Sequence, residues 1–476
     1  MRPDGKAPRR REYREYSADE QRRPAGMQRS WPEARLARSN AGRLSPRAPK
    51  DVTRAQLRVA ARWILRAGLA AVEPGRLIRA YLRVNGSGLL VGRVSVAHPS
   101  RVFVVAVGKA AIPMARAAHA VLGSRITSAV VIAPGVCPVF PRTQSFTASH
   151  PIPDAKGVQA GRCVIRLLER AKEGDVVLLL LSGGASALMP APARGVSLRV
   201  KQRLTRLLMR RGATIDELNA VRKQLSRLKG GGFARLAAPA RVITLALSDV
   251  PGDDPRVIGS GPSVPDPGAS ALARRTVRRL LKKGELPAGV ARALRRSTPP
   301  AEGVNTSATF VIGSGRVFAN AAARRARGLG FKVRSLIDGL HGEARACGPE
   351  IVRRFQALRG KPPLCLIATG ETVVKVRGSG AGGRNQELAL SAVSALGRVD
   401  RKVVLAAFAT DGVDGNSKAS GGCVDDRTQT RALDRGVAIG AALDRNDTTK
   451  ALERLSGLIV TGPTGTNIAD VVVVVG

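Results

Sequence analysis

Six short runs rich in glycine, serine, threonine and acidic residues adjoin the apolar segments of this sequence. They occupy residues 108–109, 182–186, 248–254, 369–372, 410–415 and 461–467. Each run alone is typical of a βα turn, because these residue types favour turns. Six of them indicate more, since parallel strands place their ligands beyond the carboxyl ends of the strands, at one edge of a sheet. We therefore expect a binding site built from these runs.

The run SGGASAL at residues 182–188 points to phosphate. Its small residues let the backbone approach a ligand closely, and N–H groups at the start of a following helix hold phosphate oxygens. In a second turn, Gly108 and Lys109 are followed by Ala110, which offers no hydroxyl to Mg²⁺. The Walker pattern is thus absent, and a standard P-loop fold is not expected.

A helix with clear start and stop signals is predicted over residues 214–229. Thr214 and Glu217 form a capping box at its start, and three glycines end it. Within it Arg222, Ser226 and Lys229 share one face, because they are four and seven residues apart. A solvated basic face is the alternative interpretation of these residues.

A G-x-G-x-x-G pattern lies at residues 378–383, after a candidate strand at 373–376 and before a helix that begins near Asn385. In dinucleotide-binding folds such a pattern is followed, about 20 residues on, by an acid that binds ribose. Here Arg384 follows the third glycine directly and the first acid at a strand end is Asp411. A dinucleotide site is therefore only an alternative interpretation of this pattern.

The elements that must position these runs alternate between strand and helix, as in a mostly parallel sheet covered by helices. Buried strands are predicted at residues 102–107, 129–133, 176–181, 242–247, 364–368, 403–407 and 468–475. A helix is predicted at residues 155–171, and the last strand is expected inside or at the edge of a second sheet. The predicted fold class is therefore α/β with two domains.

The length of 476 residues also favours two domains over one. We expect a disordered basic extension at residues 1–50, an N-terminal Rossmann-like domain at 51–305 and a smaller α/β domain at 306–476. A stretch rich in proline, glycine and basic residues, 261–306, is the candidate interdomain segment.

The chain is strongly basic, with 79 Lys+Arg against 35 Asp+Glu and a formal net charge of +44. Such a charge attracts polyanions of every kind without naming one. Aromatic residues, which stack on bases, make up only 3% of the chain, and no known nucleic-acid-binding motif is present. We expect no specific nucleic-acid partner.

Cysteine usage and hydropathy bear on the compartment. The five cysteines include no C-x-x-C pair and predict free thiols, which fits a reducing cytosol. No apolar run approaches the length of about 20 residues that a membrane helix needs. Acidic residues in the first 50 argue against a transit peptide. A cytoplasmic protein without membrane contact is expected.

Taken together, the motifs resemble one family, the ATP-dependent glycerate 2-kinases of the MOFRL type, some members of which were once called hydroxypyruvate reductases. The matching runs extend from about Ala55 to the C-terminus. They are AVGKAA (106–111), SHPIPD (149–154), SGGASAL (182–188), GATIDELNAVRKQLSRLKGG (212–231), LSDVPGDDPRVIGSGPSVPD (247–266), GEAR (342–345), GET (370–372), GGRNQE (382–387), TDGVDG (410–415) and TGPTGTN (461–467).

The resemblance implies an active site in the cleft between a large N-terminal and a smaller C-terminal α/β domain. Family catalytic positions correspond to Lys109 and Arg384, with Asp249 as a third candidate. Lys109, Arg384 and Mg²⁺ would stabilise the transferred phosphoryl group. Asp249 is the first choice and Asp411 the second for accepting the proton of the attacking hydroxyl.

Further residues are assigned to the ligands on the same basis. The predicted ATP-binding residues are Ser182, Gly183, Gly184, Ser186, Lys229, Gly230 and Gly231. The predicted glycerate-binding residues are Arg222, Asn385 and Asp411, with Arg222 or Arg384 gripping the carboxylate. The predicted Mg²⁺ ligands are Asp253, Glu371 and Asp414. His150, beside Pro151, is interpreted as a structural turn residue.

The predicted function is transfer of the γ-phosphoryl group of ATP to the 2-hydroxyl of D-glycerate, with ATP and Mg²⁺ as cofactors. An NAD(P)H-dependent hydroxypyruvate reductase is the alternative, and it rests on the G-x-G-x-x-G pattern and the older family name. The oligomeric state is left open, with a homodimer as one alternative.

Overall fold

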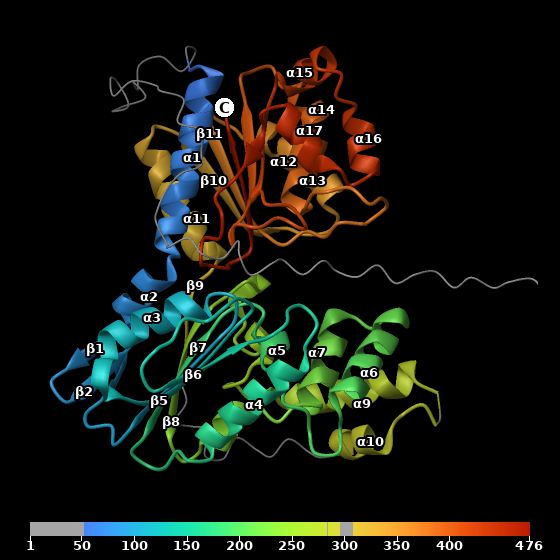
Figure 1. Ribbon diagram of the computed structural model, residues 1–476. Coiled ribbons are helices and arrows are strands. Elements are labelled where there is room, and N and C mark those ends of the chain that lie inside the picture. Colours follow the sequence, from blue (N-terminus) through green and yellow to red (C-terminus); the bar gives the residue numbers. More distant parts are fainter. Residues whose placement is uncertain (1–51, 283, 296–307) are drawn as a thin grey trace, which may run out of the picture. The chain divides into compact units, whose positions relative to one another are not determined.

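A computed structural model describes residues 52–282, 284–295 and 308–476 (Figure 1). The extension predicted to be disordered, residues 1–50, lies outside the described residues. Within the described ranges no helix combines the length and apolar character needed to cross a bilayer. All five cysteines are free thiols, as predicted.

The first sheet contains six strands, all parallel, in the order β6-β5-β4-β7-β8-β9. The strands are β4 (Val102–Val107), β5 (Ile126–Ala133), β6 (Thr143–Thr147), β7 (Val176–Leu181), β8 (Arg241–Leu247) and β9 (Ala308–Gly313). The chain winds outward from β4 to β6 and then returns to start β7 on the other side of β4. The point between β4 and β7 is therefore the topological switch point, where open parallel sheets bind ligands.

Helices cover both faces of this sheet (Figure 1). On one face lie α2 (Pro74–Tyr81) and α3 (Ala111–Leu122), and on the other α4 (Ala155–Leu168) and α8 (Gly232–Ala237). Because both faces are covered, every residue of β4 and β7 is buried. This double cover explains why the strands read as continuous apolar runs. A three-stranded antiparallel sheet of β1 (Leu82–Asn85), β2 (Gly88–Val91) and β3 (Val94–Val96) stands beside α3.

The second sheet is mixed, in the order β10-β11-β15-β12-β13-β14. Its strands are β10 (Lys332–Leu340), β11 (Leu364–Gly370), β12 (Val404–Ala409), β13 (Gly421–Asp425), β14 (Leu458–Ile459) and β15 (Asp470–Val475). Only β10 and β11 are parallel, because β15 inserts antiparallel between β11 and β12. The last predicted strand therefore lies inside the sheet, and Gly370 and Ala409 both pair with Asp470. The predicted α/β class is confirmed.

Helices also cover this sheet on both faces (Figure 1). One face carries α1 (Arg54–Ala71) and α11 (Gly315–Gly328), and the other α12 (Ala344–Gln356) and α13 (Arg384–Ser391). Short helices follow: α14 (Val393–Leu396), α15 (Thr428–Asp434), α16 (Ile439–Asp444) and α17 (Thr448–Arg454). The domain boundary expected at residues 305/306 stays a prediction. Two elements cross it, since α1 packs against β12 and β15 while β9 pairs with β8.

A helical layer extends the first half. It contains α5 (Ala185–Leu188), α6 (Leu198–Arg210), α7 (Ile215–Gln224), α9 (Pro267–Leu280) and α10 (Ala288–Arg295), the last four around a core of their own. The described part of the expected interdomain segment, 261–306, thus includes two helices that pack against α7. Single 3-10 turns occur at η2 (Gly123–Arg125), η3 (Pro251–Asp253) and η4 (Ile258–Ser260).

Two local predictions need correction. The helix predicted over residues 214–229 begins at its capping box as expected but ends at Gln224. Beyond it the backbone pairs elsewhere, since Ser226 bridges Pro192 and the N–H of Arg227 donates to Ala191. The strand predicted at 373–376 is wrong, because only Val373 forms a β-bridge, to Glu343.

Candidate functional site

The turns after β4 and β7 are joined directly at the switch point. The backbone N–H of Lys109 donates to the carbonyl of Gly183 over 2.9 Å, and the N–H of Ala110 donates to the Ser182 hydroxyl over 3.1 Å. Gly108 has φ +127°, and a Cβ there would lie 2.1 Å from Oγ of Ser182, so only glycine fits. The Ser182 hydroxyl thus ties the two turns together, and its predicted contact with ATP has no support in this geometry.

Lys109 joins the first half of the chain, which contains the parallel sheet, to the second half, which contains the mixed sheet. Its Nζ lies 2.8 Å from Oδ2 of Asp411, in the turn that follows β12. The ring of His150 lies beside the SGGASAL loop and Lys109. A Cβ on Gly184 of this loop would lie 3.0 Å from the ring and 3.5 Å from Cγ of Lys109. Burial lowers the pKa of His150, and the charge of Lys109 lowers it further. The imidazole is therefore held neutral beside the lysine.

Arg384 is the first residue of α13 and is held by two carboxylates. Its Nε lies 2.6 Å from Oδ2 of Asp470, and its Nη1 lies 2.5 Å from Oε1 of Glu371. Burial alone would lower the pKa of Arg384, but the charges of Asp470 and Glu371 outweigh it and raise the pKa. Asp470 is buried, so it anchors the guanidinium from the interior of the protein.

One cavity of about 1080 Å³ contains both Lys109 and Arg384. Its polar lining also includes His150, Glu387, Asp411, Asp414, Asn416, Asn446 and Thr466. The sequence predicted that these two cations would meet, and the structure brings them to one hollow. Because the lysine follows β4 and the arginine follows β11, this cavity is formed by strand ends of both sheets.

Asp249, in the turn after β8, lies near Lys109 but is not among the residues that line the cavity. Its Oδ2 accepts a hydrogen bond of 3.0 Å from Nδ2 of Asn467. Burial raises the pKa of Asp249, the nearby charge of Glu371 raises it further, and Lys109 and Asn467 oppose the shift. A Cβ on Gly183 would lie 2.1 Å from both Asp249 and Asn467, which explains the glycine.

The three acids predicted to bind Mg²⁺ are not brought together. Among the described residues no group of three His, Cys, Asp or Glu side chains could hold a metal ion. The oxygens of Asp414 accept four hydrogen bonds from Asn385 and Gln386, at the start of α13, and so cap that helix. Asp253 lies in the 3-10 turn η3 instead.

Asn385, predicted to bind glycerate, is also structural. It is buried, and its Nδ2 bridges Oδ1 of Asp414 and Oδ1 of Asp470 over 3.2 and 3.0 Å. The Nδ2 group therefore holds the two carboxylates beside Arg384, whereas Oδ1 of Asn385 has no hydrogen-bond partner among the described residues.

The remaining predicted ATP-binding residues meet on the other side of the SGGASAL loop. Nζ of Lys229 donates to the Ser186 carbonyl over 2.9 Å and to its hydroxyl. The N–H groups of Gly230 and Gly231 donate to Ser260 and Gly261 and are not available to a ligand. Arg222, predicted to grip glycerate, lies near Lys229 and does not line the cavity of Lys109 and Arg384.

The glycine-rich pattern at residues 378–383 has a packing explanation. A Cβ on Gly378, Gly380 or Gly383 would lie within 2.5 Å of the 445–447 segment or of Asp414. These glycines therefore let backbone segments pack closely, and the residue basis for a dinucleotide site is lost.

Three residues of functional interest were not predicted, and two of them carried a signal. Asp470 is the single charged residue that opens the apolar strand DVVVVV. Lys201 occupies the apolar stripe of α6, three and seven residues before Leu204 and Leu208. Asn467 belonged to a recognised run, but nothing in the sequence paired it with Asp249.

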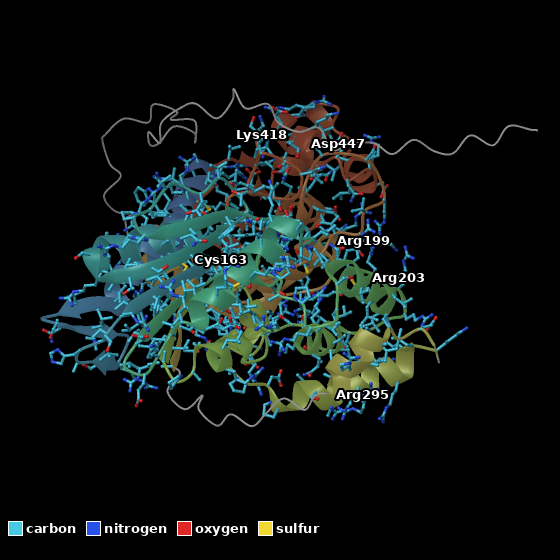
Figure 2. All side chains as sticks on the ribbon, turned by 60° about the horizontal axis from the view of Figure 1, so that its bottom comes forward. Cys163, Arg199, Arg203, Arg295, Lys418 and Asp447 are labelled. Carbon is cyan, nitrogen blue, oxygen red and sulfur yellow. The ribbon has the colours of Figure 1, made fainter. Side chains whose placement is uncertain are left out.

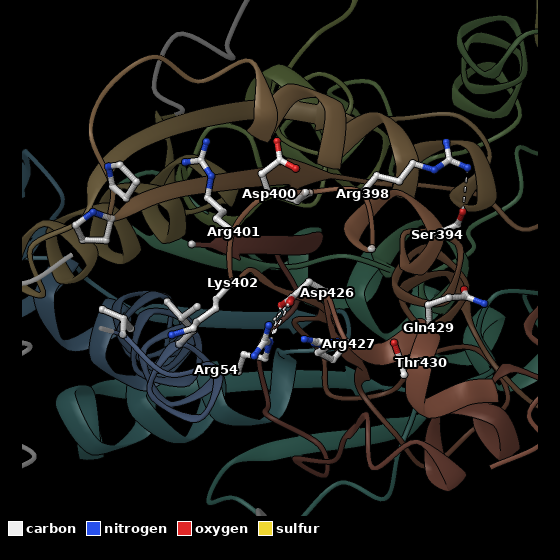
Figure 3. A pocket seen from close by; sticks show the side chains of 17 residues that line it. Arg54, Ser394, Arg398, Asp400, Arg401, Lys402, Asp426, Arg427, Gln429 and Thr430 are labelled. Carbon is white, nitrogen blue, oxygen red and sulfur yellow. Dashed lines mark hydrogen bonds and ion pairs between the residues drawn. The ribbon is translucent and has the colours of Figure 1, made fainter. Parts of the chain in front are cut away.

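A second cavity, of about 920 Å³, lies where α1 meets the second sheet (Figure 3). Figure 3 shows Arg54 turned toward Asp426, with Nη2 and Oδ2 2.5 Å apart. This cavity includes none of the residues predicted for the active site. We therefore place the site in the cavity of Lys109 and Arg384.

The fold and the site define a two-sheet α/β protein with one cavity that Lys109 and Arg384 line together with acidic side chains. A family model described as a domain of unknown function (DUF4147) matches residues 60–295, and the model of the MOFRL family matches residues 364–470. The chain is similar to the D-glycerate 2-kinase of Thermotoga maritima, with 41% identity over 384 residues, 78% of this chain and 90% of that protein. It is 35% identical to the glycerate 2-kinase of Pyrococcus horikoshii over 426 residues, 86% of this chain and 94% of that protein.

A solved structure supports the same relationship. The crystal structure of a glycerate kinase from Thermotoga maritima matches with a TM-score of 0.79 and 37% identity, over 88% of this chain and 99% of that chain. This chain belongs to the glycerate 2-kinase family. The resemblance predicted from the motifs is thereby confirmed, and these relatives give the reductase alternative no support.

Proposed function

We propose that this chain transfers the γ-phosphoryl group of ATP to the 2-hydroxyl of D-glycerate and forms 2-phosphoglycerate and ADP. Membership of the glycerate 2-kinase family supports this activity. The observation that carries it is the single cavity that Lys109 and Arg384 both line. A site with two fixed cations suits a reaction in which negative charge spreads over the phosphoryl oxygens.

Lys109 and Arg384 act on the transferred group in complementary ways. Arg384 is anchored by Asp470 and Glu371, so its charge is in place before the substrates arrive. Lys109 is held in place by Asp411, whose Oδ2 lies 2.8 Å from its Nζ, and it supplies a compact point charge. Such preorganised charge is the main source of catalysis in phosphoryl transfer.

Asp249 is the proposed general base. The O2–H proton of glycerate passes to the Asp249 carboxylate as O2 forms its bond to the γ-phosphorus and the bond to the β–γ bridging oxygen breaks. The raised pKa of Asp249 favours this role, because a more basic carboxylate accepts a proton more readily. The hydrogen bond from Asn467 orients the carboxylate.

Mg²⁺ fits a revised set of residues. Glu371 lies near Asp249 and contacts Arg384, which lines the cavity, whereas Asp414 is saturated by donors. Mg²⁺ in kinases commonly uses one or two carboxylates together with substrate phosphates, so Glu371 alone on the protein side is sufficient. When bound, the ion would neutralise charge on the phosphates.

The glycerate carboxylate is assigned to Arg384, because Arg222 does not reach the cavity. Asp411 stays a proposed neighbour of the substrate through its pairing with Lys109. A cytoplasmic location also stays a prediction, with a homodimer as one alternative for assembly.

The test is an assay of purified protein with ATP, Mg²⁺ and D-glycerate, read by phosphorus NMR. We expect the 2-phosphoglycerate resonance to grow as that of ADP does. Absence of a phosphorylated product would refute the proposal, and 3-phosphoglycerate would refute the assigned hydroxyl. A parallel assay with hydroxypyruvate and reduced nicotinamide, followed by absorbance, should show no turnover.

A further inference from the structure

A second group of charges lies in the first half, outside the cavity of Lys109 and Arg384. It consists of Lys201 on α6, Arg222 and Lys223 on α7, and Lys229 in the turn that follows; we term it the buried cation cluster. The three lysines are 5%, 7% and 5% exposed. Lysine is almost never buried to this extent without a partner, so the cluster needs an explanation.

The cluster has too few anionic partners. Lys223 pairs with Asp266, whose Oδ2 is 2.5 Å from its Nζ. Nζ of Lys229 donates to the carbonyl and the hydroxyl of Ser186, and Nη1 of Arg222 lies 3.4 Å from Oδ1 of Asn219. Nζ of Lys201 has no hydrogen-bond partner in the part of the chain that the structure describes. One paired carboxylate therefore stands against four cations.

Burial and mutual repulsion lower the pKa values of two lysines in the cluster. Burial and, to a lesser extent, the nearby charge of Arg222 together lower the pKa of Lys201 to about 8. Burial also lowers the pKa of Lys229, with added repulsion from Lys201, Arg222 and Lys223. Among the described carboxylates, Asp266 pairs with Lys223, and the charge of Lys223 also acts on Asp254.

Packing alone does not account for Lys201. Along α6 it lies between Arg199 and Arg203, which are exposed and project outward in Figure 2. Lys201 instead occupies the apolar stripe with Leu204 and Leu208, where leucine or methionine would fill the space without an unpaired charge. Its ammonium group is placed for an anion that completes the cluster.

The position of the cluster shows which anion. Lys229 contacts Ser186, and Gly184, two residues earlier on the same loop, lies beside Lys109. The cluster and Lys109 thus flank one loop at the switch point. A chain of phosphates that starts at Lys109 would follow this loop toward Lys229.

We propose that the buried cation cluster is an anion-binding site for the polyphosphate of the nucleotide, with Lys201 as a phosphate-binding residue that neither the motifs nor the family match indicates. This inference rests on the proposed function, since it assigns the γ-phosphate to Lys109. Ammonium groups donate up to three hydrogen bonds each, and such charge-assisted bonds to phosphate are strong.

Calorimetric titration of the full chain with sodium tripolyphosphate, and separately with ATP, tests the site. We expect Lys201→Met to weaken both ligands about tenfold or more, because charge-assisted bonds contribute strongly to affinity. The KM for glycerate should stay unchanged. Lys172→Met, an exposed lysine on the same half, is the matched control and should bind like the wild type.

Two readouts separate binding from a structural role. The melting temperature of free Lys201→Met should stay equal or rise, since the substitution removes an unpaired buried charge. Tripolyphosphate binding at pH 8 should take up protons in the wild type, because an anion raises the pKa of Lys201. This uptake, measured in buffers of different ionisation enthalpy, should fall in the variant. Arg222→Gln, at a partly exposed position, should weaken tripolyphosphate in the same direction.

The outcomes distinguish this site from the proposed function. If Lys201→Met and Arg222→Gln bind tripolyphosphate as tightly as the wild type, the site is refuted even when the wild type makes 2-phosphoglycerate. If binding depends on Lys201 but no 2-phosphoglycerate forms, the site stands and the kinase proposal falls.

Discussion

The two halves of this molecule differ in how their charged side chains are paired. In the second half the charges around Arg384 are matched, since the guanidinium pairs with Asp470 and Glu371 while amides saturate the carboxylate of Asp414. In the first half the buried cation cluster holds four cations around one paired carboxylate. A matched set keeps a fixed geometry without ligand, whereas an unmatched set gains most when an anion arrives. The second half is therefore built to position groups and the first to receive phosphate.

Sheet topology underlies this difference. In the second half an antiparallel strand, β15, delivers Asp470 to the point where β11 and β12 end, directly beneath Arg384. In the six-stranded sheet of the first half all strands are parallel, so only turns and helix starts reach the ligand edge. The turns after β4 and β7 supply glycine and lysine, and the acids come from the turn after β8, as Asp249, Asp253 and Asp254.

The largest expected effects come from the two cations of the shared cavity. Lys109→Ala and Arg384→Ala should each lower kcat by a factor of about 10² or more, as removal of transition-state charge does. Only Arg384→Ala should also lower the melting temperature clearly, because it leaves Asp470 buried without its partner. Steady-state kinetics and thermal unfolding of both proteins measure this.

Lys172→Ala, an exposed position, is the control for both measurements. Near-normal turnover in either cavity variant would remove that residue from the mechanism. Equal melting temperatures would contradict the contrast drawn between the halves.

A smaller effect is expected in the pH dependence of kcat/KM. Asp249 accepts a proton only when it is ionised, and its pKa is raised, so activity should fall as pH drops through a value above the usual aspartate pKa of about 3.9. Glu371→Gln removes a like charge and should move this acidic limb to lower pH, whatever it does to the maximum rate. Asp249→Asn should abolish the limb together with most activity.

The profile is measured at saturating Mg²⁺ and over a pH range in which the protein stays folded. An acidic limb that stays in place in Glu371→Gln would contradict the coupling between the two carboxylates.

The smallest effects concern two capping boxes, one associated with each half. Thr53 caps α1, which packs on the second sheet, and Thr214 caps α7, which carries two members of the buried cation cluster. Alanine at either position should cost about 1 kcal/mol and lower the melting temperature by about 2 °C. Only Thr214→Ala should weaken tripolyphosphate, by about twofold, if α7 positions that ligand.

Each variant is the matched control of the other in thermal unfolding and calorimetry. Weakened binding in both would attribute the effect to general destabilisation.

Much of the fold followed from local signals. The strand Val102–Val107 was predicted at its bounds because a doubly covered parallel strand is apolar throughout. The capping box of Thr214 was equally local, but the end of its helix was not, since Ser226 and Arg227 leave it to pair with a distant segment. Tertiary hydrogen bonds of this kind have no signature in the helix itself.

The site was predictable in part. Turns that follow parallel strands bring Lys109 and the SGGASAL loop together, and the motif resemblance added Arg384. Asp414, one of the three predicted Mg²⁺ ligands, caps helix α13 from 29 residues farther along the chain, a pairing that no local pattern specifies. Asp470 escaped notice because its partner depends on where β15 inserts, which no local pattern specifies.

The insertion of β15 also sets an order of events during synthesis. Every strand of the first sheet precedes residue 314, whereas the second sheet lacks a central strand until residues 470–475 have been made. Domains fold as they emerge from the ribosome, so the nascent chain carries a finished phosphate-binding half well before the other half closes. Arg384 meets its buried counter-ion only once Asp470 has been made, so this ion pair forms well after the first sheet is complete.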